Sequence, residues 1–142
     1  MSTQRNKELV RRLFEETFNR GSEVGDELLH PNYKNHNFPA PAPGIEGWKM
    51  TIAMFRAAFP DMRVVIEDEV AEGDKVAARG YFTGTHRGEF MGIPATNKSI
   101  HVPYIDIWTI EDGRLKDNWV QMDMLGLMQQ LGVIPTPDGT PA

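Results

Sequence analysis

Residues 99–122 read SIHVPYIDIWTIEDGRLKDNWVQM, and they carry the clearest structural pattern in the chain. Ser99 to Ile110 has the β-branched and aromatic content of a long strand. Glu111-Asp112-Gly113-Arg114 follows with an Asp-Gly pair, which is typical of a tight hairpin turn. Leu115 to Met122 then predicts the returning strand. The stretch therefore predicts an antiparallel hairpin at the centre of a sheet.

The preceding residues extend this sheet. Met62 to Ala71 alternates apolar and polar side chains with a period of two, as a strand does. Glu72-Gly73-Asp74-Lys75 predicts another hairpin turn, and Val76 to Thr85 predicts the next strand. His86 to Asn97 contains glycine and proline and predicts an irregular connection to the long strand at Ser99.

Helical patterns dominate the first part of the chain. Apolar residues recur at helical spacing up to the stop signal Asn19-Arg20-Gly21, and Ser22 is a candidate N-cap for a second helix. Tyr33 to Phe38 predicts a short strand. The predicted helices span residues 4–19, 22–29, about 46–59 and 123–131. Helices followed by hairpin-connected strands predict an α+β fold, with the helices on one face of a curved antiparallel sheet.

Length and composition indicate a single domain over residues 1–134, because 142 residues suit one core. Residues 135–142 are rich in proline and glycine and predict a flexible tail. No apolar run approaches the roughly 18 residues that a membrane span needs. The polar N-terminus does not resemble a secretory signal. We therefore expect a cytoplasmic protein with no membrane partner.

Charge and residue usage limit the partners further. The formal net charge is −5, so the surface repels phosphate backbones and predicts no nucleic-acid partner. There is no cysteine, and no two of the four histidines have the spacing of a metal-binding pair, so we predict no metal. There is no GxGxxG sequence and no P-loop, which predicts a chain without a cofactor.

Several segments, taken in order, resemble the SnoaL-like polyketide and ester cyclases of the nuclear transport factor 2-like superfamily. They include Asn35-His36, Trp119, and the run Asp123 to Gly132 (DMLGLMQQLG). The others are Gly44 to Trp48, Ala58 to Asp61, Ala71 to Asp74, Gly84 to Pro94, Ile105 to Trp108 and Glu111 to Arg114. The resemblance implies a ketosteroid isomerase-like, cone-shaped α+β barrel whose central pocket is the site.

Asp123 is the first candidate for a catalytic residue. The resemblance implies that an aspartate at this position is the acid/base that removes a proton next to a carbonyl group, so that a ring closes by aldol attack. That role needs a carboxyl group in an apolar pocket, where desolvation makes it more basic. The alternative is structural, because an aspartate that precedes a helix is an ordinary N-cap.

Five further residues are candidates for substrate binding. His36 is expected at the mouth of the cone, and Trp119 is expected on the face that it shares with Asp123. His101 faces opposite to Tyr104 and Asp106 if their strand is regular, and Pro103 could mark a bulge that breaks this parity. Which set faces inward stays open, and an inward Asp106 could orient His36 or His101.

Three functions remain in competition. The first is a cofactor-free polyketide cyclase that acts on a small hydrophobic carbonyl compound. The second is a non-catalytic module for binding small molecules or for dimerisation. The third is an isomerase or an epoxide hydrolase, for which Arg79 is the mid-strand basic residue, without an evident flanking pair of carboxylates. We also expect a homodimer through the outer sheet face, since not all of the apolar strand residues can face one pocket; these are Val65, Val76, Ala78, Ile107 and Trp108.

Overall fold

The computed structural model describes residues 2–135. Its helices are α1 (Thr3–Phe14), α2 (Gly25–Leu28), α3 (Gly44–Ala58) and α4 (Met124–Gln130), and a π-helical turn, η1 (Glu15–Asn19), continues α1. Its strands are β1 (Leu29–Asn35), β2 (Arg63–Glu72), β3 (Lys75–Thr85), β4 (Ser99–Glu111) and β5 (Arg114–Met122). Residues 136–142, which make up nearly all of the predicted tail, lie outside the described residues.

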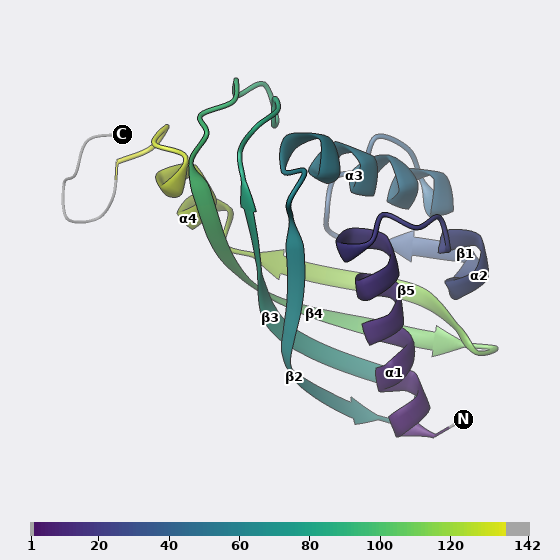
Figure 1. Cartoon of the computed structure of the whole chain (residues 1–142). Coiled ribbons are helices and arrows are strands. Elements are labelled where there is room, and N and C mark those ends of the chain that lie inside the picture. The colour runs from purple at the N-terminus through teal and green to yellow at the C-terminus, as the bar shows by residue number, and fades with distance from the viewer. Residues whose placement is uncertain (1, 136–142) are drawn as a thin grey trace.

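One curved sheet of five strands runs in the order β1-β5-β4-β3-β2. The pairs β2–β3, β3–β4 and β4–β5 are all antiparallel. Each joins two strands that follow one another in the chain, as the sequence predicts. Figure 1 shows that α1 and α3 lie over one face of this sheet, which gives the predicted α+β cone. Both hairpin turns are confirmed, because Gly73, Asp112 and Gly113 have the positive φ angles of tight turns.

The sheet bends strongly because β2 contains a bulge opposite a glycine. The pairing of β2 with β3 shifts register between Ile66 and Asp68. A Cβ atom on Gly80 of β3 would lie 1.8 Å from the carbonyl oxygen of Val65, so only glycine fits there. Bulges increase local twist and bend the strand. This bend closes the sheet around the helices.

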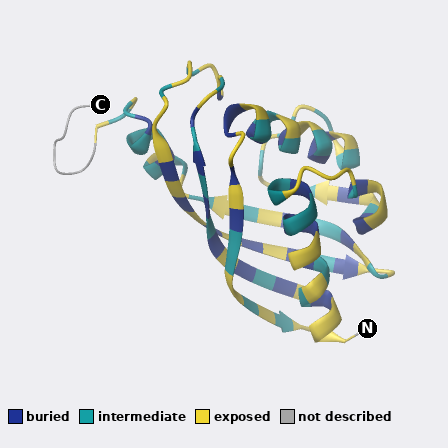
Figure 2. Cartoon of the chain, viewed as in Figure 1, coloured by how far each residue is buried: buried dark blue, intermediate teal, exposed yellow. Residues whose placement is uncertain are grey.

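Strict alternation separates the two faces of β4. Ile100, Val102, Tyr104, Asp106 and Trp108 are buried, whereas the odd-numbered residues between them are exposed or half-buried. Figure 2 shows the same alternation along β3 and β4. Pro103 pairs with Tyr81 in regular register, so it does not mark a bulge. The question left open by the sequence is thereby settled in favour of an inward Tyr104 and Asp106.

Two local predictions are wrong in the segment between the first and third helices. The second helix is only α2, its N-cap position is Val24 rather than Ser22, and the chain then enters β1 at Leu29. The strand predicted over residues 33–38 therefore begins earlier, and it runs parallel to β5. Pro31 lies within β1, where the edge position tolerates a residue without a backbone N–H.

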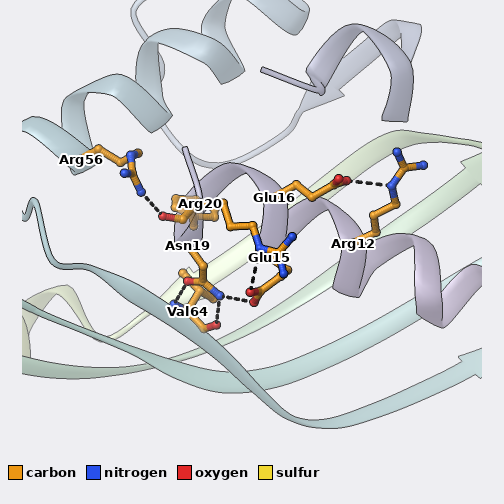
Figure 3. A network of polar contacts seen from close by, with 8 residues as sticks. Arg12, Glu15, Glu16, Asn19, Arg20, Arg56 and Val64 are labelled. Carbon is orange, nitrogen blue, oxygen red and sulfur yellow. Dashed lines mark hydrogen bonds and ion pairs between the residues drawn. The ribbon is translucent and has the colours of Figure 1, made fainter. Parts of the chain in front are cut away.

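The π-helical turn joins the helical layer to the sheet. The Asn19 side chain donates to the carbonyl oxygen of Val64 at 3.0 Å and accepts from its N–H at 2.6 Å. Arg56 of α3 donates to the carbonyl oxygen of Phe18 at 2.5 Å, so α3 is tied to the same turn. Figure 3 shows these contacts together with the surface pair of Arg12 and Glu16.

Helix α4 covers the part of β4 that β5 leaves unpaired. The pairing of β4 with β5 begins at Tyr104, so residues 99–103 of β4 extend beyond it. Gln130 binds the backbone of His101 twice, since its Oε1 accepts from the N–H at 2.6 Å and its Nε2 donates to the carbonyl at 2.9 Å. A strand edge covered in this way does not offer free backbone groups to another chain.

Among residues 2–135, no helix is long and apolar enough to cross a membrane.

Candidate active site

A cavity of about 70 Å³ lies between the helices and the inner face of the sheet. Its walls are mainly aromatic and apolar, and seven polar or polar-tipped side chains interrupt them. The aromatic and apolar residues include Phe14, Phe18, Phe38, Phe55, Met62, Phe82 and Met122. The polar and polar-tipped residues are Asn35, Trp48, Thr51, Tyr104, Asp106, Trp108 and Asn118. Apolar walls with a few placed polar groups are typical of a small-molecule site.

Asp106 is the only acidic residue that lines the cavity of the described chain. It is 3% exposed, and its Oδ1 has no hydrogen-bond partner. Burial raises the pKa of its carboxyl to about 7, the neighbouring Trp108 indole opposes this shift, and the charge of Glu69 adds to it. A carboxyl group whose pKa lies near neutrality can both take and return a proton.

Glu69 supports the proton affinity of Asp106 from a short distance. Glu69 pairs with Ala78, and Ala78 pairs with Asp106, so the two acids lie in one row across three strands. The Glu69 carboxyl contacts the guanidinium of Arg11 at 2.5 Å and is almost fully buried. Burial raises the pKa of Glu69, whereas Arg11 lowers it.

Two buried donors near the cavity lack partners, and a third, the Trp108 indole, has only the Asp106 carboxyl group beside it. The two are the Tyr33 hydroxyl and the indole nitrogen of Trp48. Tyr33 stacks on Trp108 with 6.2 Å between ring centroids, and Trp48 meets both rings edge-on. An unpaired buried donor costs about 1–3 kcal/mol. Such a group needs an explanation, and a bound ligand oxygen would supply one.

The two asparagines at the cavity have defined orientations. Asn118 is 3% exposed and donates to the carbonyl oxygen of Ile107 at 3.5 Å. The Oδ1 of Asn35 accepts from the N–H groups of Asn37 and Phe38 and so fixes the start of the loop after β1. The hydroxyl of Tyr104 donates to the carbonyl of Val65 at 3.1 Å. These groups are held by the protein before any ligand binds.

The structure places Asp123 outside the cavity. Asp123 is exposed and is the N-cap of α4, where its Oδ1 accepts from the N–H of Gly126 at 2.8 Å. Its neighbour Met122 lines the cavity, because strand alternation turns successive side chains to opposite faces. This geometry corresponds to the helix-cap alternative. It lacks the apolar surroundings on which the predicted acid/base role depends.

His36, Trp119 and His101 also lie away from the cavity. The ring of His36 stacks on the exposed Trp119 with 4.3 Å between centroids, and its Nε2 lies 2.8 Å from Oδ1 of Asp117. His101 is exposed and stacks on Tyr81 on the outer face. The expected pairing of Asp106 with either histidine therefore does not occur, since Asp106 points inward and both histidines point outward.

Arg79 is flanked by carboxylates, contrary to the sequence reading. Its guanidinium contacts Asp68 and lies 3.7 Å from Glu67, but all three side chains are about half exposed. They belong to the outer face, because Arg79 pairs with the exposed Ile105. A hydrolase centre needs such a group inside the pocket, so this arrangement does not favour the epoxide hydrolase alternative.

A potential metal-binding cluster that the sequence did not suggest lies at the end of the sheet. His30, Glu111 and Asp112 bring their ligand atoms within 4.8 Å of one another. His30 Nε2 is 3.2 Å from Glu111, and both acids are exposed at the hairpin turn. The histidine ring also accepts from the N–H of Asn32 through Nδ1. The group is remote from the cavity and functions as a surface contact between β1 and the turn.

Sequence reasoning did not single out Tyr33, Trp48 and Trp108 as functional. All three are aromatic, and such residues are usually core packing. The relevant signal is the period-two pattern of β4, which puts Trp108 on the same face as Asp106 once the inward face is known. For Trp48, which lies on another element, no sequence signal shows that it lines the cavity. Tyr33 packs against both indoles without lining the cavity itself.

Comparison with known proteins agrees with this geometry. A family model described as SnoaL-like polyketide cyclase matches residues 8–131. The chain belongs to this family. The matched residues include most of α1, all of α2 and α3, the five strands and α4. The cavity therefore lies entirely within the matched region.

Individual relatives cover nearly the whole chain. The aklanonic acid methyl ester cyclase DnrD of Streptomyces peucetius is 33% identical over 98% of this chain and 98% of its own length. The nogalonic acid methyl ester cyclase of Streptomyces nogalater is 30% identical over 80% of this chain and 86% of its own. The structure of TsrD from Streptomyces laurentii superposes with a TM-score of 0.87 at 35% identity, covering 94% of this chain and 99% of TsrD.

Proposed function

We propose that this SnoaL-like cyclase closes a ring in a carbonyl compound by an intramolecular aldol addition, with Asp106 as the acid/base. The observation that carries the proposal is a single buried carboxyl group, with its pKa raised to about 7, in an aromatic cavity. The two methyl ester cyclases that resemble the chain support a polyketide methyl ester as the substrate class.

The proposed reaction needs one proton acceptor and no external reagent. Ionised Asp106 removes a proton from the carbon next to a carbonyl group, and the electrons of that C–H bond form an enolate. The enolate carbon attacks a second carbonyl carbon of the same molecule, so a C–C bond forms and a C=O π bond breaks. Protonated Asp106 returns its proton to the resulting alkoxide. Substrate and product are isomers, and the enzyme is regenerated.

The volume of the cavity suits the reacting part of a polyketide and not the whole molecule. Ligand sites for whole drug-sized molecules usually measure about 300–1,000 Å³. A cavity of about 70 Å³ holds the reacting end of a larger molecule around Asp106. The remaining rings of a polyketide would lie toward the opening or require aromatic side chains to move.

The central experiment compares two aspartate variants with the wild-type enzyme. Purified proteins are incubated with aklanonic and nogalonic acid methyl esters, and ring-closed isomers of unchanged mass are separated by chromatography. Asp106→Asn should lower kcat by about 10²–10⁴-fold, because the loss of a general base has this size. Asp123→Asn should change kcat by less than about threefold, since Asp123 lies outside the cavity.

Each alternative outcome has a defined meaning. Loss of turnover in Asp123→Asn, with Asp106→Asn active, would transfer the acid/base role to Asp123, as the family resemblance first implied. Saturable binding of the esters without turnover by the wild type would support a non-catalytic binding module. Thermal unfolding of both variants serves as the control for folding.

The pH dependence provides a second test of the same assignment. Because the base acts in its ionised form, kcat/KM should rise with pH and level off above an apparent pKa near 7. A profile that is already flat between pH 5 and pH 8 would contradict Asp106 as the base.

We further propose that the enzyme is a cytoplasmic homodimer that pairs through the outer sheet face. Ile105, Ile107 and Trp119 are exposed there on neighbouring strands, and α1 and α3 lie on the opposite face. Contiguous exposed apolar side chains commonly mark an interface. The net charge of −5 supports the expectation that nucleic acid is not a partner.

A further inference from the structure

Two tryptophans from opposite layers of the fold line one cavity. Trp48 belongs to α3 and Trp108 to β4. Both indole nitrogens are buried. The Trp48 N–H has no hydrogen-bond partner, and the Trp108 N–H has only the carboxyl group of Asp106, whose pKa it lowers. The ring centroids of the two indoles are 5.8 Å apart, with the planes nearly perpendicular at 75°. The Trp48 N–H is therefore available to a ligand, and the Trp108 N–H is held less strongly once Asp106 is protonated.

The surrounding aromatic rings hold these donors in place. Phe14 packs edge-on against Trp108, and Phe18 packs edge-on against Trp48, with centroid distances of 6.0 and 5.6 Å. Tyr33 contacts both indoles. Donors fixed before the reaction require no reorganisation when charge develops, and this makes them effective in stabilising a transition state.

The donors stand next to the proposed base. Asp106 and Trp108 are separated by one residue on β4 and point to the same face, so their Cα atoms are roughly 7 Å apart. A substrate can therefore place its oxygen at the indoles while its C–H bond faces the carboxyl group.

We propose that Trp48 and Trp108 form an oxyanion site that binds the substrate's carbonyl oxygen as it becomes an enolate oxygen. The inference rests on the proposed function and adds two catalytic residues to it. It also specifies the substrate class, which is a ketone or ester whose oxygen accepts two hydrogen bonds beside an acidic C–H. Among the cavity-lining residues of the described chain none is Lys, Arg or His, so neutral donors must meet the negative charge.

A binding experiment tests this site without any turnover. The probe is 4-nitrophenolate, whose oxygen carries the charge of an enolate, and 4-nitroanisole is the matched ligand that cannot ionise. The Asp106→Asn protein mimics the enzyme after proton transfer, and the measurement is made well above the pKa of the phenol, so that the probe is ionised. The three indole N–H signals are followed in ¹H–¹⁵N spectra and assigned with three Trp→Phe variants.

The expected spectra distinguish the two cavity indoles from the third. Phenolate binding should move the Trp48 and Trp108 N–H signals downfield and slow their exchange with water, and it should leave Trp119 unchanged. Trp119 is the matched control, because its indole lies on the outer face. Shifts at Trp48 and Trp108 no larger than that at Trp119, or no saturable phenolate binding, would overturn the proposal.

Replacement of tryptophan by phenylalanine removes the N–H donor but keeps an aromatic ring, so it tests the two contributions separately. Trp48→Phe should weaken phenolate binding about tenfold, change 4-nitroanisole binding less than twofold, and lower kcat by about 10–100-fold, within the effect of losing one oxyanion donor. Trp119→Phe should alter none of these. Equal loss of both ligands in Trp48→Phe would indicate packing alone. Failure of the proposed function would instead appear as unaffected turnover in Asp106→Asn, an independent result.

Discussion

Asp106 and Asp123 carry the same carboxyl group in opposite surroundings. Asp106 is buried in an aromatic cavity, whereas Asp123 is exposed at a helix N-terminus, where a backbone N–H binds it. Desolvation favours the protonated form of the first carboxyl group, and the second is stabilised as a cap. The chemistry assigned to each residue therefore follows from position and not from residue type.

The raised pKa of Asp106 predicts a pH-dependent stability. Its carboxyl titrates near 7 in the folded chain and near 4 in the unfolded chain, so the folded state binds more protons between these values. The free energy of unfolding should consequently fall as the pH rises through this window. The loss between pH 5 and pH 8 should be on the order of 2–3 kcal/mol.

Urea unfolding at pH 5 and pH 8 measures this loss. Asp106→Asn cannot ionise, so its stability should decline less than that of the wild type and should exceed it at pH 8. Asp123→Asn is the matched control and should follow the wild-type pH dependence. An identical decline in Asp106→Asn and wild type would show that the burial of Asp106 does not control its proton.

At the scale of elements, the joint between η1 and β2 depends on one side chain. Asn19 makes two hydrogen bonds with the backbone of Val64, both in a partly buried position. Asn19→Ala should therefore lower the free energy of unfolding by about 1–3 kcal/mol, because backbone groups lose their partners. Arg12→Ala, which removes only exposed ion pairs with Glu16 and Glu27 in the same region, should cost less than about 1 kcal/mol.

Denaturant unfolding of the two variants provides the measurement. If Asn19→Ala lowers the free energy of unfolding no more than Arg12→Ala does, Asn19 does not stabilise the contact between η1 and β2. Asn19→Asp offers a further comparison, since it keeps an acceptor for the N–H of Val64 but places a second acceptor against the Val64 carbonyl.

The sequence predicts elements well where the signal is local. The hairpin turns at Gly73 and Asp112-Gly113 follow from turn chemistry, and the strands beside them follow from alternation. The segment from Ser22 to Asn35 could not be predicted in this way. β1 is stabilised by pairing with β5, a partner roughly 85 positions later in the chain, and long-range pairing overrides local propensity.

The site was predictable only in part for a related reason. Tyr104 and Asp106 share a face in any regular strand, but the sequence cannot show which face the helices cover. His36 is expected at the mouth of the cone and Trp119 on the face of Asp123, but the two rings stack on each other on the outer surface. Asp123 lies one residue after the inward Met122, and this single step in the alternation places it outside.

At the scale of the whole molecule, the outer face of the sheet determines the proposed assembly. Ile105 is 60% exposed and Trp119 is 38% exposed, although both are large apolar residues on central strands. Ile105→Lys combined with Ile107→Lys should convert the proposed dimer to a monomer, because the charges would be buried without partners. The inner cavity should remain intact in this variant.

Sedimentation velocity and phenolate binding check this prediction together. The wild type should sediment at about twice the monomer mass at micromolar concentration, and the double variant should sediment as a monomer. Phenolate affinity should stay within about twofold, since neither isoleucine lines the cavity. A wild-type monomer at these concentrations would contradict the dimer.

The parallel pairing of β1 with β5 has a consequence for protein synthesis. β1 leaves the ribosome early, but β5, its strand partner in the sheet of residues 2–135, is made almost last. Until β5 emerges, the cavity wall that contains Asn35 has no strand to pair with, and the aromatic side chains of the cavity remain open to solvent. The nascent chain is thus vulnerable to aggregation for most of its translation, and the domain can become functional only at the end.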